Sequence, residues 1–100
     1  MNKKTALQAF KARCVPGARV CLYARWLPGD GELREVHALR SRDVAFLRPT
    51  DTVSYLLMPK ASEIRQVGAA EFEITNTFEC GTETLRYVFE DAAEAERKDA

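Results

Sequence analysis

Long apolar runs are absent from this chain of 100 residues, and none approaches the roughly 20 residues that a membrane helix needs. The basic start at residues 1–5 is not followed by the apolar segment of a signal peptide, because polar residues such as Gln8 and Arg13 interrupt it. No internal repeat or linker divides the chain. We therefore expect a cytoplasmic protein that does not bind membranes, with one domain over residues 1–90 and an acidic tail over residues 91–100.

Cysteine and histidine are scarce, with three cysteines and one histidine. An odd number of cysteines without a C-x-x-C motif argues against a disulfide framework and for reduced thiols. The set that could hold zinc is Cys14, Cys21, His37 and Cys80. These residues lack the close pairs typical of structural zinc sites, and no catalytic motif or phosphate-binding loop is present. We expect a protein that is not an enzyme and that has no catalytic residue, metal or cofactor.

Regular alternation of apolar and polar residues is what the chain does contain. A helix is predicted over residues 2–13, with Asn2 or Thr5 as its N-terminal cap. One stripe of this helix is apolar, at Leu7, Phe10 and Cys14. Beyond it, short runs with a period of two are separated by turn residues. These runs predict strands at residues 19–26, 33–40, 44–47, 53–57, 72–78 and 85–89.

One helix followed by five or six short strands predicts an α+β, mainly β domain. Hairpin-length connections favour an antiparallel meander that closes into a small SH3-like barrel. A single open sheet with the helix across one face is the alternative. Residues 59–63 are expected to form a loop or a single helical turn, and residues 80–83 a turn.

Charge is balanced overall but divided along the chain. Residues 1–50 hold ten Lys/Arg and four Asp/Glu, a net of +6, whereas residues 51–100 hold five and eleven, a net of −6. The basic half offers an arginine–tyrosine face and the acidic half an acidic rim, and either can meet a charged partner. The candidate binding residues are Arg19, Tyr23, Arg25, Trp26, Arg40, Arg42, Glu71 and Glu73.

Each candidate has a functional and a structural interpretation. Exposed arginines beside a tyrosine on a small barrel can bind single-stranded nucleic acid, but they also pair with glutamates on neighbouring strands. Glu71 and Glu73 can face the cationic channel of a nucleic-acid enzyme, or simply solvate a strand face. Trp26 is an anchor for a protein partner if it is exposed with Leu27 and Pro28, although we favour a place for it as a lid of the core.

Two short motifs resemble a known group of proteins. The segment Ser-Tyr-Leu-Leu-Met-Pro-Lys-Ala-Ser-Glu at residues 54–63 and the run Leu-Arg-Tyr-Val-Phe at residues 85–89 resemble motifs in a loose group of small, uncharacterised phage and prophage proteins. The resemblance covers residues 33–90. Because the group has no assigned activity, the resemblance implies a mobile-element origin and assigns no functional residue.

The sequence as a whole favours binding over catalysis. We predict a small non-enzymatic interaction protein of a phage or other mobile element, which binds a host or phage protein complex and inhibits nucleic-acid handling or host defence. The alternative is an SH3-like accessory protein that binds nucleic acid. Whichever charged surface stays unpaired in the fold decides between the two, and the oligomeric state is left open.

Overall fold

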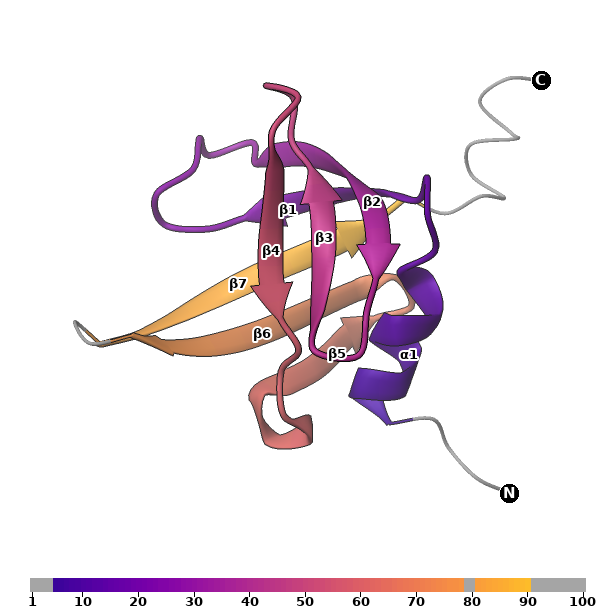
Figure 1. The fold of residues 1–100 in the computed structure, drawn as a ribbon. Coiled ribbons are helices and arrows are strands. Elements are labelled where there is room, and N and C mark those ends of the chain that lie inside the picture. Colours follow the sequence, from indigo (N-terminus) through magenta and orange to yellow (C-terminus); the bar gives the residue numbers. More distant parts are fainter. Residues whose placement is uncertain (1–4, 79–80, 91–100) are drawn as a thin grey trace.

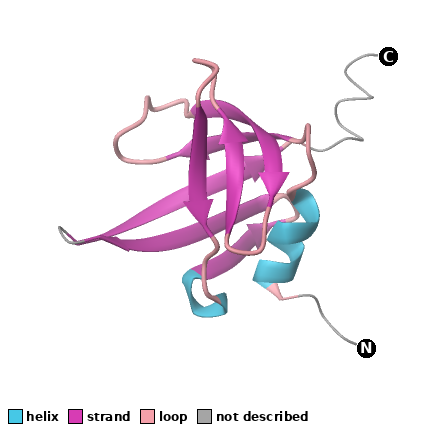
Figure 2. Ribbon diagram, in the orientation of Figure 1, coloured by secondary structure: helices cyan, strands magenta, loops and turns pink. Residues whose placement is uncertain are grey.

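The computed structural model describes residues 5–78 and 81–90, which form one α-helix, one 3-10 turn and seven strands (Figure 2). In chain order these are α1 (Ala6–Arg13), β1 (Arg19–Tyr23), β2 (Glu32–Leu39), β3 (Asp43–Leu47), β4 (Val53–Leu57), η1 (Ala61–Glu63), β5 (Ile64–Gly68), β6 (Glu71–Phe78) and β7 (Gly81–Phe89). All seven strands pair antiparallel in one sheet of order β4-β3-β2-β1-β7-β6-β5. The chain is therefore α+β and mainly β, as predicted.

The sheet differs from the expected barrel in strand number and in closure. It has seven strands instead of five or six, because the residues after η1 form the additional strand β5. Two meanders, β1–β4 and β5–β7, replace the single meander and join where β1 pairs with β7. Its edge strands β4 and β5 do not pair with each other, so the sheet stays open and is not the closed SH3-like barrel. The predicted alternative, an open sheet with one helix, is nearer to the observed fold.

The open sheet curves until its two halves face each other. In Figure 1, β2, β3 and β4 cross steeply in front of β6 and β7. Alternate side chains of each strand point into the space between the halves. They form one buried core, which includes Val20, Leu22, Val36, Val44, Phe46, Leu56, Phe72, Ile74, Leu85, Tyr87 and Phe89.

Helix α1 packs against β5 and covers that side of the curved sheet (Figure 1). Thr5 caps it, because the Thr5 hydroxyl accepts the Gln8 backbone N–H while the Gln8 side chain accepts the Thr5 N–H. Phe10 is fully buried and meets three rings edge-on at centroid distances of 5.5 to 5.7 Å: Phe72, Tyr87 and Phe89. The helix predicted for residues 2–13 is thus observed over Ala6–Arg13, and residues 2–4 lie outside the described part.

Several element ends fall elsewhere than predicted. The first strand ends at Tyr23, so Arg25 and Trp26 lie in the β1–β2 loop. Strand β7 begins at Gly81, inside the segment expected to be a turn, because β6 and β7 form a long hairpin that pairs residue by residue to Phe78. Of the two forms expected for residues 59–63, a loop or a single helical turn, the structure has a turn, η1, at Ala61–Glu63.

The predicted acidic tail at residues 91–100 and the thiol of Cys80 lie outside the described residues. No helix among those described has the length and apolar character needed to cross a membrane.

Candidate binding surface

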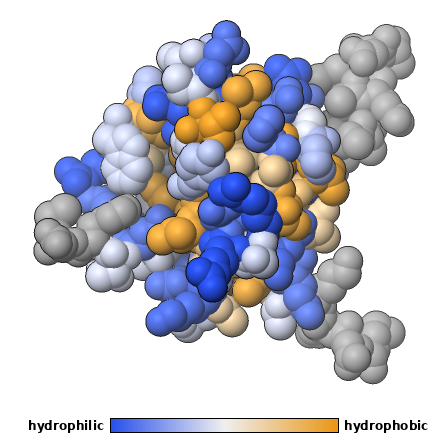
Figure 3. Space-filling view, viewed as in Figure 1, coloured by the Kyte–Doolittle hydropathy of each residue, from blue (hydrophilic) through white to orange (hydrophobic). Residues whose placement is uncertain are grey.

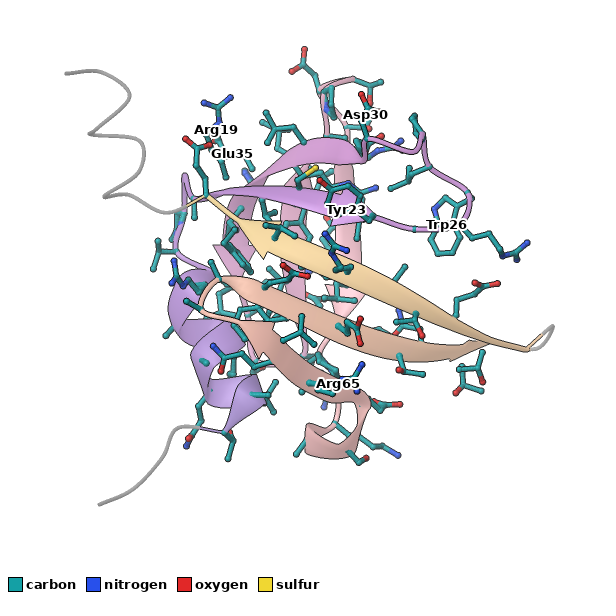
Figure 4. The ribbon with its side chains drawn as sticks, turned by 180° about the vertical axis from the view of Figure 1, so that it is seen from behind. Arg19, Tyr23, Trp26, Asp30, Glu35 and Arg65 are labelled. Atoms are coloured by element: carbon teal, nitrogen blue, oxygen red, sulfur yellow. The ribbon has the colours of Figure 1, made fainter. Side chains whose placement is uncertain are left out.

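The ends of the predicted arginine–tyrosine face pair with acidic residues of the second half of the chain. Arg25 donates two hydrogen bonds to one carboxylate oxygen of Glu83, the one from Nε at 2.9 Å. This contact raises the pKa of Arg25 and lowers the pKa of Glu83. Arg19 lies 3.8 Å from the carboxylate of Glu90 and also stands opposite Glu35 in the β1–β2 register. Figure 4 shows Arg19 beside Glu35 and far from Trp26, near opposite ends of the β1 segment.

The middle of the same face is occupied by an arginine of β7. The guanidinium of Arg86 lies 4.8 Å from the centre of the Tyr23 ring. Arg86 also forms an ion pair with Glu71 of β6 at 3.0 Å. Glu73, on the same face of β6, pairs with Arg65 of β5. Glu71 and Glu73 thus pair with arginines of their own half of the chain. The acidic residues that neutralise the basic strand β1 are Glu83 and Glu90, because pairing in the sheet brings distant segments of the sequence together.

The last two predicted arginines lie at the β2–β3 turn. Arg40 makes a two-pronged contact with Asp43, at 2.6 and 2.9 Å, and its guanidinium lies 5.0 Å from the centre of the Tyr55 ring. The Asp43 contact raises the pKa of Arg40. Arg42 is exposed and forms no ion pair within the described residues. Among the arginines predicted to bind nucleic acid, Arg42 is thus the one that does not pair with a carboxylate in the described part of the chain.

A second charged cluster lies on the inner side of the sheet. Glu32 accepts hydrogen bonds from Arg48 at 3.0 and 3.1 Å and from Arg34 at 2.7 Å. The two bonds from Arg48 are the main cause of the low pKa of Glu32, about 2, and the one bond from Arg34 lowers it further. Arg34 is only 9% exposed and also donates to the Ser54 hydroxyl at 3.1 Å. All these polar groups are partnered, so the cluster fixes the positions of β2 and β4.

Trp26 is 56% exposed, so the preferred prediction that it is a lid of the core is wrong. Its loop leaves the end of β1 and turns at Pro28, where Gly31 N–H bonds to the Pro28 carbonyl. The indole lines a cavity of about 230 Å³ between the two halves of the sheet. The other lining residues are Leu22, Arg34, Ser54, Tyr55, Leu56, Asn76, Leu85 and Tyr87.

A larger cavity of about 430 Å³ adjoins this one along β4. Its lining residues are Tyr55, Leu56, Leu57, Met58, Pro59, Lys60, Glu63, Asn76 and Thr77. The two cavities share Tyr55, Leu56 and Asn76. Together they form a groove between β4 and β6, on the open side of the curved sheet, which we call the β4 groove.

The outer side of β4 is apolar as well. Val53, Tyr55 and Leu57 point away from the core and are 39%, 60% and 75% exposed. Figure 3, seen from the side of β4, shows apolar side chains that interrupt the polar surface over β3 and β4. Large exposed apolar side chains that adjoin one another are typical of protein contacts.

The described thiols and the histidine are not arranged for chemistry. Cys14, the C-terminal cap residue of α1, is buried in the core, and burial raises its pKa to about 12. Cys21 lies on the outer face of β1 with its Sγ 3.6 Å from the Asp30 carbonyl oxygen, and His37 is exposed on β2. Among residues 5–78 and 81–90, no three His, Cys, Asp or Glu side chains are grouped so that they could hold a metal ion.

Most of the groove was not singled out from the sequence. Tyr55 and Leu57 read as ordinary members of an apolar strand, and the absence of charge from residues 53–57 is more typical of a strand inside a sheet than of an exposed edge. In the structure Arg34 points inward while its apolar neighbour Leu33 is 46% exposed, the reverse of the usual pattern.

Comparison with known proteins found no match to a family model, a curated protein or a solved structure.

Proposed function

We propose that this chain is a non-enzymatic protein-interaction module that binds a host or phage protein complex through the β4 groove. The observation that carries the proposal is a contrast between two surfaces. Trp26 and Tyr55 are exposed beside an open groove, whereas the arginines of the alternative surface are paired with carboxylates. The phage origin rests on the sequence resemblance. The inhibition of a defence or nucleic-acid-handling complex rests on that origin together with the divided charge of the sequence.

The chemistry of the groove suits a polypeptide partner. Tryptophan and tyrosine are frequent anchors of protein interfaces, because each buries a large apolar area and offers one polar atom. The two cavities, of about 230 and 430 Å³, have room for partner side chains. Asn76 and Lys60 at their margins offer hydrogen-bond donors to a partner.

Nucleic-acid binding receives less support. Affinity for a phosphate backbone comes from cations that release counterions on binding. A carboxylate already held at hydrogen-bond distance, as Glu83 is by Arg25, competes with phosphate for that arginine. Arg86 lies over the Tyr23 ring, as Arg40 lies over the Tyr55 ring, so neither ring is a stacking platform for a base on that side.

A capture experiment with matched variants tests the proposal. The tagged protein is used to isolate partners from a bacterial lysate, and the affinity for any stoichiometric partner is then measured with purified components. We expect Trp26→Ala to weaken binding by roughly 30-fold or more, as for a buried interface anchor. Val67→Ala, an exposed residue on the opposite edge strand β5, is the control and should leave affinity unchanged.

Two results would count against the proposal. One is the absence of any stoichiometric protein partner for a protein that circular dichroism shows to be folded. The other is a partner whose affinity is the same for wild type and for Trp26→Ala, since that partner would bind elsewhere.

A further inference from the structure

The two edges of the sheet are protected to very different degrees. Edge strand β5 carries Arg65, has an irregular register between Gln66 and Gly68, and lies beside α1. Charges, bulges and covering elements are the usual means by which an edge avoids pairing with another chain. Edge strand β4 has none of these: it contains no charge and no proline, and all five of its residues pair in continuous register with β3.

Two hydrogen bonds at the ends of β4 show which backbone groups are left open. Arg48 N–H donates to the Thr52 carbonyl at 2.9 Å, and Met58 N–H donates to the Arg42 carbonyl at 2.8 Å. Hydrogen-bonded and non-bonded pairs alternate along an antiparallel ladder. The even-numbered residues of β4 therefore turn their N–H and C=O toward β3. The backbone N–H and C=O groups of Val53, Tyr55 and Leu57 point to the free edge.

We propose that two copies of this chain pair through β4, antiparallel and with the two-fold axis at Tyr55. In this register Tyr55 exchanges both backbone hydrogen bonds with the partner's Tyr55, and Val53 does so with the partner's Leu57. Every open N–H and C=O of the strand is then bonded. On the outer face the strands themselves contribute only apolar and aromatic side chains, and the Arg40 guanidinium, paired with Asp43, lies over each Tyr55 ring. The inner face sets Ser54 opposite the partner's Leu56.

Charge at the strand ends favours this pairing. Asp51 precedes β4 and Lys60 follows it, and neither forms an ion pair within residues 5–78 and 81–90. An antiparallel register centred on Tyr55 brings the Asp51 end of each copy to the Lys60 end of the other. A parallel arrangement would place like charges together, which is unfavourable. The β4 edge is thus complementary to itself in the antiparallel orientation. A second copy of the chain is therefore the partner that fits it.

This inference goes beyond the proposed function and does not depend on it. Self-pairing uses the same edge of the β4 groove that another protein would approach, so the pair forms when the protein is concentrated without such a partner. A partner that binds through Trp26 competes with it. The two proposals can therefore fail separately. The protein could bind a partner through Trp26 without forming a dimer, or form the dimer without binding such a partner.

Light scattering on a size-exclusion column tests the pairing. Wild type is expected to move from the monomer mass to twice that mass as its concentration rises from micromolar toward millimolar. Tyr55→Lys should stay monomeric, because two lysines would face each other at the two-fold axis. Val67→Lys, on the exposed surface of β5, should dimerise like wild type. A monomeric wild type at every concentration, or an undiminished dimer of Tyr55→Lys, would overturn the proposal.

Disulfide trapping tests the register with a variant that needs no change of charge. Opposed residues in a hydrogen-bonded antiparallel pair have Cα atoms about 5.5 Å apart, within the range that a disulfide spans. Under a mild oxidant, Tyr55→Cys should give a dimer whose bridge maps by mass spectrometry to position 55 of both chains. Val67→Cys is the control and should give little dimer. No bridge at position 55, or equal bridging in the control, would contradict the two-fold axis at Tyr55.

Discussion

Phe46 of β3 stacks on Tyr87 of β7, with ring centroids 5.6 Å apart and an interplanar angle of 26°, although β2 and β1 lie between these strands in the sheet. The contact is possible only because the open sheet curves back on itself. Both side chains are almost fully buried, and burial raises the pKa of Tyr87 above its usual range. The pair joins the two halves of the sheet and thereby holds the β4 groove in shape.

We predict that Phe46→Ala lowers the free energy of unfolding by about 3–5 kcal/mol, the usual cost of removing a buried aromatic ring. That is a large part of the whole free energy of unfolding of a domain of this size. Urea unfolding followed by tryptophan fluorescence or circular dichroism measures it. Leu57→Ala, at a residue 75% exposed, should change stability by less than about 0.5 kcal/mol. Equal effects of the two substitutions would mean that the stacked pair is not part of the core.

Acid should weaken the fold through Glu32. Hydrogen bonds from Arg48 and Arg34 lower the pKa of Glu32 from 4.5 to about 2 in the folded protein. A carboxylate with a depressed folded pKa stabilises the protein above its unfolded pKa, and this contribution is lost as pH falls from about 4.5 toward 2. Glu32→Gln should cost roughly 1–3 kcal/mol at neutral pH and should flatten this part of the stability profile. Urea unfolding at a series of pH values checks both effects, and an unchanged acid slope in Glu32→Gln would contradict the assignment.

The β1–β2 loop depends on a glycine at position 31. Gly31 has φ of +81°, and a Cβ there would lie 2.7 Å from Sγ of Cys21 and 2.9 Å from the carbonyl oxygen of Leu22. Gly31→Ala is therefore expected to destabilise the protein by about 1–3 kcal/mol. Gly29→Ala is the matched control in the same loop, because nothing lies within 4 Å of its Cβ position. Thermal unfolding of both variants tests this, and equal melting temperatures would be inconsistent with the described loop.

Binding to single-stranded oligonucleotides should be weak at moderate salt. The arginines that would contact phosphate are paired with carboxylates, apart from Arg42. Fluorescence anisotropy across a salt series should show a shallow dependence of affinity on salt, and Arg42→Ala should remove most of what binding remains. Tight binding with a steep salt dependence would instead favour the nucleic-acid alternative.

Local patterns predicted much of the fold, and nonlocal pairing explains what they missed. Phe10 in α1 and Cys14 at its C-terminal cap both face the core, as their helical spacing predicts, and the alternation around Phe72 and Ile74 marks β6. The strand beginning at Ile64 was missed because its other four residues are exposed and show no alternation. Which strands meet, and hence which charges cancel, depends on contacts that no short window of sequence contains.

The candidate site was harder to predict than the fold. The sequence did mark Trp26 as an anchor if exposed, but its exposure depends on β1 ending at Tyr23. The β4 groove exists because the sheet stays open beside β4 while α1 covers the side of β5. Neither the missing closure nor the position of Arg34 inside the sheet follows from local alternation.

Amide hydrogen exchange along β4 tests most directly the claim that its open edge binds another polypeptide strand. The amides of Ser54 and Leu56 point to β3 and should exchange slowly at any protein concentration. The amides of Val53, Tyr55 and Leu57 should exchange fast in dilute protein and become protected as concentration rises and β4 strands pair. Fast exchange of these three amides at all concentrations, with Ser54 and Leu56 protected throughout, would contradict it.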